Sequence, residues 1–86
     1  MDTQWLLAGR YQGLPIIPVD TVIKDFFPTM KRDYFLRKIA DGGIALPLVK
    51  MEASSKCAKG VHIADLAAYI DQRHAEATAA HNRMHH

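Results

Sequence analysis

The spacing of the apolar positions changes along the chain, and each change marks an expected element. Between residues 19 and 27, apolar side chains recur at intervals of three and four, which is the period of an amphipathic helix. A second helical stripe covers residues 30 to 40. Pro28 ends the first helix because it cannot continue the backbone hydrogen bonds, and Thr29 is a good N-cap for the second. The pattern therefore predicts two helices joined by a turn of three residues at most.

The N-terminal part carries a weaker pattern. Residues 3 to 12 predict a short helix that Thr3 caps and Gly13 ends. The stretch Pro-Ile-Ile-Pro at residues 15 to 18 suits a short extended edge segment, because proline cannot donate to a strand ladder. Trp5 is expected in the core together with the large apolar side chains Phe26, Phe27, Phe35 and Leu66.

The second half of the chain begins with an extended pattern. Residues 44 to 51 predict a strand that Pro47 confines to an edge, and residues 60 to 62 can return as its partner. The small, polar and basic residues 53 to 60 would form the eight-residue tip of this hairpin. Apolar residues at helical spacing then predict a long closing helix from Ile63, whose stripe weakens in its second half.

This order of elements predicts a fold. Two helices joined by a short turn and followed by a hairpin describe a winged helix-turn-helix. We therefore expect a mainly α fold of this kind, with a small β-hairpin and a long C-terminal helix. A chain of 86 residues has room for one small domain. We assign residues 1–74 to this domain, and residues 75–86 to an extension of the last helix or a frayed tail.

The composition is that of a globular protein and excludes several classes. Hydrophobic residues make up 49% of the chain and charged residues 23%. No apolar run approaches the ~18 residues that span a bilayer, and no charged start with an apolar stretch marks a signal peptide. Cys57 is the single cysteine, so an intrachain disulfide is impossible. These features predict a cytoplasmic protein without a membrane partner.

Basic residues gather in the middle of the sequence. Eight basic and four acidic residues lie between Lys24 and Lys59, whereas the two flanks together hold three basic and five acidic residues. A basic centre with mildly acidic ends is typical of a polyanion-binding face on a nearly neutral body. An ordinary solvated surface is the alternative that the charge alone leaves open.

The predicted elements carry this charge on two parts of the fold that suit duplex DNA. A helix fits the major groove, which is about 12 Å wide, and a basic hairpin loop can reach phosphates or the minor groove. The helix at residues 30 to 40 and the loop at residues 53 to 60 therefore form the candidate interface. Its candidate DNA-binding residues are Lys31, Arg32, Tyr34, Arg37, Lys38, Lys50, Ser54, Ser55, Lys56 and Lys59.

These candidates divide by role, because phosphate contacts position a protein on DNA and base contacts specify the site. Arg37 is the best candidate for reading guanine, since its planar fork bonds two acceptors at once. Lys56 and Lys59 are assigned mainly to phosphates, with Lys50 beside them. Tyr34 can pack on a sugar or a thymine methyl group. A purely structural role, at the negative end of the helix dipole, stays open for Arg37.

The signals for other chemistry are weaker. His74, His81 and His85 can share one helical face, but no cysteine or carboxylate joins them at the spacing of a metal motif. A redox role for Cys57 needs a local environment that the sequence does not specify. His62 is expected to pack or to act as a cap at a strand end. We find no phosphate loop, nucleophile motif or carboxylate pair, so we expect no enzyme activity, cofactor or bound metal.

Several segments carry a resemblance to a known family. The most specific are Lys59-Gly60-Val61-His62 and the run from Asp65 to Asp71, Asp-Leu-Ala-Ala-Tyr-Ile-Asp. Shorter matching pieces are Arg37 to Pro47, Leu6 to Tyr11 and Ile17-Pro18. Taken together, the chain from about Thr3 to His74 resembles the pyocin activator (PrtN-like) family.

This resemblance implies a bacterial transcription activator. Its members switch on phage-tail-like bacteriocin genes, or related prophage genes, by binding repeated boxes upstream of them. The wing and the closing helix resemble, more loosely, excisionase and MerR-type DNA-binding domains. The chain has Ser54-Ser55-Lys56 where the family pattern has Ser-Gln-Lys, so a hydroxyl replaces an amide that is able to read a base edge.

Two other functions stay open at this point. An excisionase-like protein would bend DNA by cooperative loading, and a footprint at a recombination site rather than a promoter would reveal it. A phage-encoded adaptor would bind another protein through the C-terminal helix and show no salt-sensitive binding to duplex DNA. The expected partners are double-stranded DNA, RNA polymerase, and further copies of the chain in a homodimer or cooperative array. The closing helix and the Trp5 region are expected to make the contacts between copies.

Overall fold

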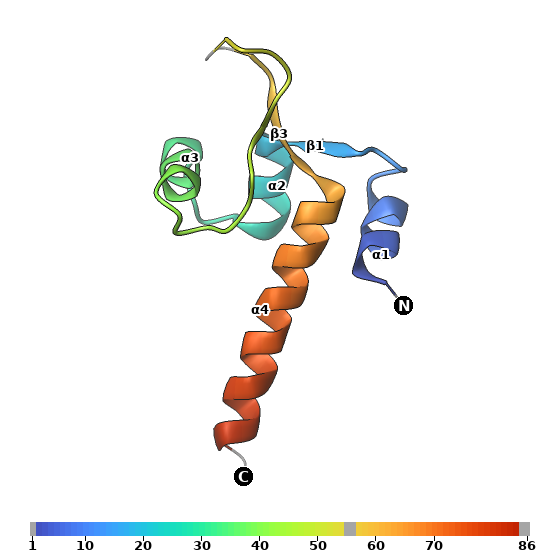
Figure 1. Cartoon of the computed structure of the whole chain (residues 1–86), viewed down its shortest axis with the longest axis vertical. Helices are drawn as coiled ribbons and strands as arrows, with labels where there is room; N and C mark the ends of the chain where they lie inside the picture. Colours follow the sequence, from blue (N-terminus) through green and yellow to red (C-terminus); the bar gives the residue numbers. More distant parts are fainter. Residues whose placement is uncertain (1, 55–56, 85–86) are drawn as a thin grey trace.

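The structure, a computed structural model, describes residues 2–54 and 57–84. Within them, helices alternate with short strands (Figure 1). In chain order the elements are α1 (Thr3–Arg10), β1 (Ile16–Pro18), α2 (Val19–Phe26), α3 (Arg32–Ala40), β2 (Val49–Lys50), β3 (Lys59–His62) and α4 (Ile63–Met84). The expected mainly helical fold with a small hairpin and a long C-terminal helix is confirmed. No helix in the described part of the chain has the length and apolarity that crossing a membrane requires.

The strands form one antiparallel sheet in the order β1-β3-β2. β2 and β3 make the predicted hairpin, in which Lys50 lies opposite Lys59. The tip that the sequence placed at residues 53–60 ends earlier, because Lys59 and Gly60 already belong to β3. The segment at residues 15–18 supplies a third strand, since Ile17 pairs with Val61 on the other edge of β3. The sequence predicted an extended segment there but not its pairing partner.

Two features of the sheet are the short length of β2 and the close contact between β1 and β3 at Gly60. The predicted strand at residues 44–51 is shorter than expected, since only Val49 and Lys50 pair with β3 and the N–H of Ile44 bonds to the carbonyl of Lys38 after α3 instead. In the central strand, Gly60 lies directly against β1. A Cβ atom at this position would come within 2.5 Å of Ile16 Cγ2 and 2.7 Å of the Ile17 carbonyl oxygen, so only glycine fits.

The core lies where the sheet meets α2, α3 and the first half of α4. Its fully buried large side chains are Phe35, Ile17, Leu66, Val19, Val22 and Val61. The Phe27 ring lies 5.1 Å from the ring of Phe35 and 6.1 Å from that of Tyr69, which ties the end of α2 to both α3 and α4. The expected burial of Phe35 and Leu66 is therefore confirmed, whereas Phe26 and Phe27 are half-buried.

The prediction for α1 was wrong at three points. Asp2, not Thr3, caps the helix, since its carboxylate accepts the N–H of Gln4 at 3.0 Å. The helix ends at Arg10, because the backbone at residues 12 and 13 takes left-handed conformations. Trp5 is 72% exposed instead of buried, since α1 turns Leu7 and Tyr11 toward α4 and the rest of the core.

The link between α2 and α3 is longer than predicted. Five residues, 27–31, separate the two helices, and α3 begins at Arg32 instead of at position 30. Met30 donates its N–H to the carbonyl of Phe27, which closes a turn that holds Thr29 outside the helix. Lys31, and not Thr29, therefore occupies the N-cap position of α3, in an extended conformation.

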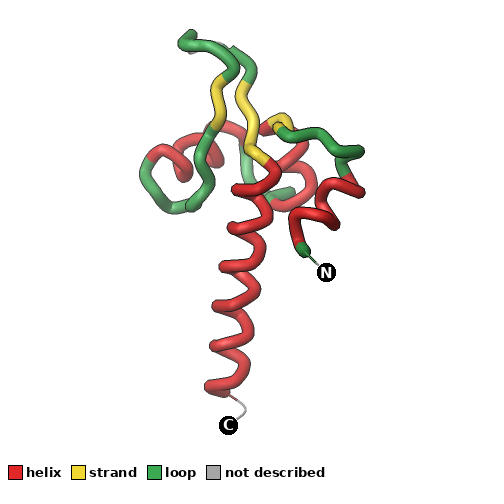
Figure 2. Tube along the Cα trace, turned by 45° about the vertical axis from the view of Figure 1, so that its right-hand side comes forward, coloured by secondary structure: helices red, strands yellow, loops and turns green. Residues whose placement is uncertain are grey.

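The last helix begins at a side-chain cap and projects beyond the rest of the molecule. His62 Nδ1 accepts the N–H of Ala64 at 3.0 Å, which confirms the expected capping role of this histidine. α4 then runs without a break through residue 74 to Met84. Its second half stands clear of the other elements in both views (Figures 1 and 2).

Candidate nucleic-acid interface

The first part of the candidate interface is the outer face of α3, defined here as Lys31, Tyr34, Arg37 and Lys38. Helical spacing turns Phe35 inward, where it is fully buried, and leaves Tyr34 on the opposite side at 44% exposure. Lys31 and Arg37 are exposed and Lys38 is half-buried. Lys31, Tyr34 and Arg37 are exposed as the sequence predicted, whereas Lys38, which was expected on the same side, lies next to the buried one.

The aromatic ring of Tyr34 organises the cations on this face. The guanidinium carbon of Arg37 lies 5.7 Å from the ring centroid, and the Lys38 ammonium lies 5.8 Å from it. Both distances are within the range of a cation–π interaction. The ring therefore favours conformations in which both charges lie beside it on one surface.

A shallow hollow of about 430 Å³ opens on the same face. It is lined by Thr29, Met30, Lys31, Tyr34 and Arg37. Cations at its rim suit phosphate oxygens or base acceptors, and the Met30 and Tyr34 side chains suit an apolar group such as a methyl. Thr29 and Met30 were not among the predicted site residues, because their place in the hollow depends on the five-residue turn that the sequence did not reveal.

Arg32 lies apart from this face. Its guanidinium nitrogen is 2.8 Å from the Asp20 carboxylate, so it joins the start of α3 to the start of α2. The pair is exposed and contributes little to stability by itself.

The second part of the candidate interface is the β2–β3 hairpin and its loop. Lys50 is exposed and lies directly across the ladder from Lys59, which is half-buried. Ser54 is exposed and its carbonyl accepts the N–H of Cys57. The two remaining predicted residues, Ser55 and Lys56, lie outside the described part of the chain.

The two parts project from different edges of the fold. Figures 1 and 2 both show α3 and the β2–β3 loop lying away from α1 and from the C-terminal end of α4. Among the described candidates, Lys31, Tyr34, Arg37, Lys50 and Ser54 are exposed, whereas Lys38 and Lys59 are half-buried.

The titratable groups with shifted pKa values lie elsewhere, at the contact of α1 with α2. The hydroxyl of Tyr11 donates to the Asp25 carboxylate at 2.6 Å, and Arg10 lies 3.3 Å from the same carboxylate. The hydrogen bond from Tyr11, together with the Arg10 charge, lowers the pKa of Asp25. Burial and the bond to Asp25 raise the pKa of Tyr11. This cluster positions α1 and makes no contact with the candidate interface.

Among the described residues, no three histidine, cysteine, aspartate or glutamate side chains come together at a metal-binding distance. His85, one of the three histidines that share a helical face in the sequence, lies outside those residues.

Comparison with known protein families decides where the chain belongs. A family model described as "Pyocin activator protein PrtN" matches residues 3–77, from the start of α1 into the second half of α4. The chain belongs to the pyocin activator family. The resemblance found in the sequence is thereby confirmed over nearly the same residues. Pyocin activators are a regulatory family and not a family of enzymes, and this points to a role in controlling pyocin expression. Neither the curated proteins nor the solved structures searched contain a match to this pyocin activator.

Proposed function

We propose that this chain is a sequence-specific DNA-binding transcription activator of pyocin-like bacteriocin genes or related prophage genes. In this proposal α2 and α3 form a helix-turn-helix, and the β2–β3 hairpin is its wing. Residues 1–74 constitute the DNA-binding domain and residues 75–86 extend it. The protein acts in the bacterial cytoplasm at the nucleoid, where it binds repeated boxes upstream of promoters and contacts RNA polymerase.

The observation that carries this proposal is the composition of the outer face of α3. A helix that packs through one buried phenylalanine and presents Lys31, Tyr34, Arg37 and Lys38 to solvent has the width and charge that the major groove accepts. The family contributes the regulatory setting, since an activator of gene expression acts most directly by binding DNA.

The proposed contacts divide between the helix and the wing. Arg37, restrained by Tyr34, reads guanine, and the hollow beside it receives a thymine methyl or a sugar. Lys31 and Lys38 bind phosphates or base edges. Lys50 and Lys59 bind phosphates, and the predicted contacts of Ser54, Ser55 and Lys56 complete the wing.

The experiment is a binding titration of the full chain by fluorescence anisotropy. A pool of random duplexes is first enriched on the protein to find its preferred box, and binding to this box is then compared with binding to a shuffled duplex at several salt concentrations. We expect the box to bind at least ~10³-fold more tightly than the shuffled duplex, and both affinities to fall steeply as salt rises.

The alternatives give different results in the same titration. Binding that lacks salt dependence, or no binding to any duplex, would contradict the proposal and favour a protein adaptor. Strong cooperative binding with bending of the duplex, and a footprint at a recombination site, would contradict activation and favour an excisionase-like architectural role.

A further inference from the structure

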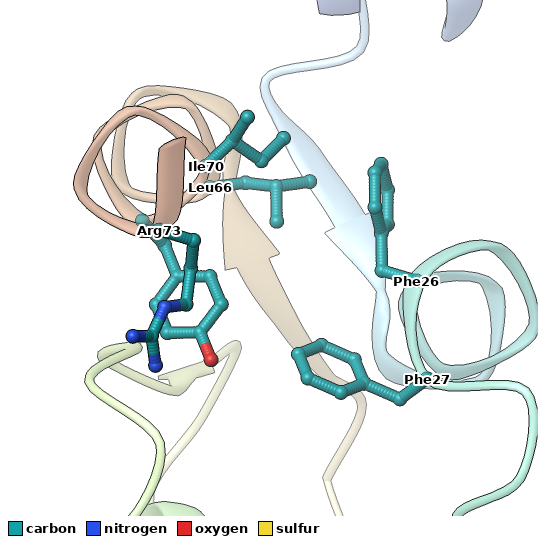
Figure 3. Close-up of a pocket in the computed structure, with 6 residues that line it drawn as sticks. Phe26, Phe27, Leu66, Ile70 and Arg73 are labelled. Carbon is teal, nitrogen blue, oxygen red and sulfur yellow. The ribbon is translucent and has the colours of Figure 1, made fainter. Parts of the chain in front are cut away.

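An apolar pocket of about 280 Å³ lies between the end of α2 and the middle of α4. Figure 3 shows Phe26 and Phe27 on one side of it and Leu66, Ile70 and Arg73 of α4 on the other. The pocket is slightly smaller than a typical small-molecule site of ~300–1,000 Å³. Arg73 is the one charged residue among those that line it. Its size and lining suit one or two apolar side chains.

The pocket opens onto a stripe that continues along the projecting half of α4. The residues of this stripe, called here the α4 seam, are separated by alternating steps of four and three, which is the heptad spacing of helices that pack side by side. The α4 seam consists of Leu66, Ile70, Arg73, Ala77, Ala80 and Met84. The first three line the pocket, and Met84 at the far end is 80% exposed.

The projecting half of α4 buries little of its surface against its own chain. Residues 71–84 are exposed apart from Ala80, which is half-buried. This half continues from the packed first half of α4, which supplies the helix nucleus, but its own residues gain little from tertiary packing. A helix that stands out in this way is stable when its seam is covered.

We propose that a second copy of this chain covers the α4 seam, with the two α4 helices antiparallel and a twofold axis near residue 75. In this arrangement Met84 of each copy enters the apolar pocket of the other. The contact is isologous, so it closes as a dimer and leaves both pockets filled. This inference does not depend on DNA binding.

Steric complementarity along the seam supports this pairing. With the axis near residue 75, Leu66 and its pocket lie opposite Met84 of the second copy, and Ile70 lies opposite Ala80 of the second copy. Large side chains thus face small ones, and the one large pair falls where the pocket provides space. Sliding the helices by one further heptad step would place Ala77 against Ala80 and leave the pockets empty.

Charge complementarity supports the same register. Arg73 and Glu76 form an ion pair within one helix. In the antiparallel pair, Arg73 lies level with Glu76 of the second copy, so two arginines and two glutamates gather around the axis with no net charge. A partner of unrelated sequence would have to supply both this charge pattern and an apolar side chain for the pocket, whereas a second copy supplies both.

The first test is the oligomeric state of the full chain, measured by sedimentation equilibrium across a range of concentrations. We expect a dimer. Ala80→Glu, which places a charge in the seam opposite Ile70, should raise the dimer dissociation constant by at least ~100-fold. Ala79→Glu is the matched control because position 79 points away from the seam, and its dissociation constant should stay within about threefold of the parent value. Circular dichroism verifies that both variants remain helical.

The second test is the direction of the helices, measured with a short bismaleimide cross-linker in a Cys57→Ser background. His74→Cys should cross-link efficiently, because the two copies of this position lie beside the axis. His81→Cys occupies the equivalent helical position two turns further on and should not cross-link, since its copies are separated by about 18 Å along the axis.

Three results would overturn this inference. A parent protein that stays monomeric at all concentrations would show that no second copy covers the seam. Equal weakening of the dimer by Ala80→Glu and Ala79→Glu would place the contact elsewhere. Equal cross-linking at positions 74 and 81 would indicate parallel helices, which leave the two pockets empty.

Discussion

At the scale of single residues, the geometry of the interface depends on Tyr34. Its ring is the common neighbour of Arg37 and Lys38, at 5.7 Å and 5.8 Å from their charged groups. A guanidinium restrained in this way loses less side-chain entropy on binding than one that moves freely. The same ring forms part of the wall of the hollow that Met30 and Thr29 complete. Tyr34 therefore lies beside two positive charges and also provides apolar surface in the hollow.

Replacing Arg37, which lies beside the Tyr34 ring, tests its assigned role in reading guanine. Arg37→Ala should reduce discrimination between the preferred box and a shuffled duplex by about 1–3 kcal/mol, because the two hydrogen bonds to guanine are lost. Arg37→Lys keeps the positive charge but loses the planar guanidinium group that donates two parallel hydrogen bonds. It should therefore retain most of the non-specific affinity and lose as much discrimination between the two duplexes as Arg37→Ala. Anisotropy titrations of both variants measure this. Undiminished discrimination in Arg37→Ala would remove Arg37 from base reading.

Gly60 gives a residue-scale prediction about stability. Gly60→Ala should destabilise the fold by about 1–3 kcal/mol, because its Cβ would overlap Ile16 Cγ2 and the Ile17 carbonyl and push β1 away from β3. Gly9→Ala is the control, since a Cβ at this position in α1 meets open space. This substitution should raise the free energy of unfolding by about 0.5–1 kcal/mol. Urea unfolding followed by circular dichroism measures both. A stable Gly60→Ala variant would contradict the close approach of β1.

At the scale of elements, α1 is held to the body at both ends. Thr3 at its start donates a hydrogen bond to the Asp71 carboxylate of α4 at 2.5 Å. Tyr11 and Arg10 at its end contact Asp25 of α2. The helix therefore docks through two polar contacts and the buried side chain of Leu7, and its opposite face, which carries Trp5, is left exposed.

The Asp25 contact makes the docking of α1 sensitive to pH. The pKa of Asp25 is lowered in the folded state, so its contribution to stability is present above the unfolded value of about 3.9 and is lost as the pH falls through the folded value. The pKa of Tyr11 is raised, so its contribution is present below the unfolded value of about 10 and is lost as the pH rises through the folded value.

A single substitution isolates this effect. Tyr11→Phe removes the hydroxyl that lowers the pKa of Asp25, so the fall in unfolding free energy between about pH 5 and about pH 2 should be smaller than in the parent chain. Circular dichroism is the appropriate probe, since the exposed Trp5 reports little of unfolding. Identical acid profiles for the parent and the variant would show that the Tyr11–Asp25 bond does not stabilise the fold.

The sequence predicted those elements that a local pattern specifies. The 3.6-residue period of α2 and the apolar start of α4 gave their positions, because each buries one face and exposes the other. The pairing of β1 with β3 and the bond between Tyr11 and Asp25 were not predicted, since both join segments that are distant in sequence. Trp5 was assigned to the core on residue type alone, and only the docking of α1 decides which side faces inward.

The candidate interface was predictable to a similar extent. Helical spacing was enough to place Tyr34 and Arg37 away from the buried Phe35, whereas Lys38, three positions after Phe35, is half-buried. The hollow beside them was not predictable, because it depends on how residues 27–31 turn. The position of Lys31 ahead of the helix follows from the same turn.

At the scale of the whole molecule, two surfaces at different ends have separate proposed roles. The outer face of α3 and the β2–β3 loop would bind DNA, whereas the α4 seam, which runs away from them, would bind a second copy (Figure 1). Because the two surfaces do not overlap, a dimer would present two copies of the interface and could occupy repeated boxes with a fixed spacing. Loss of one function should therefore leave the other measurable.

The central claim is that the outer face of α3 and the β2–β3 hairpin meet the same duplex. Amide chemical-shift mapping of the isotope-labelled full chain, titrated with the enriched duplex, tests this most directly because it reports on every element at once. We predict that the largest shifts fall at residues 29–38 and 50–59, with little change in α1. Shifts concentrated in α1 or in the projecting half of α4, with α3 unchanged, would contradict it.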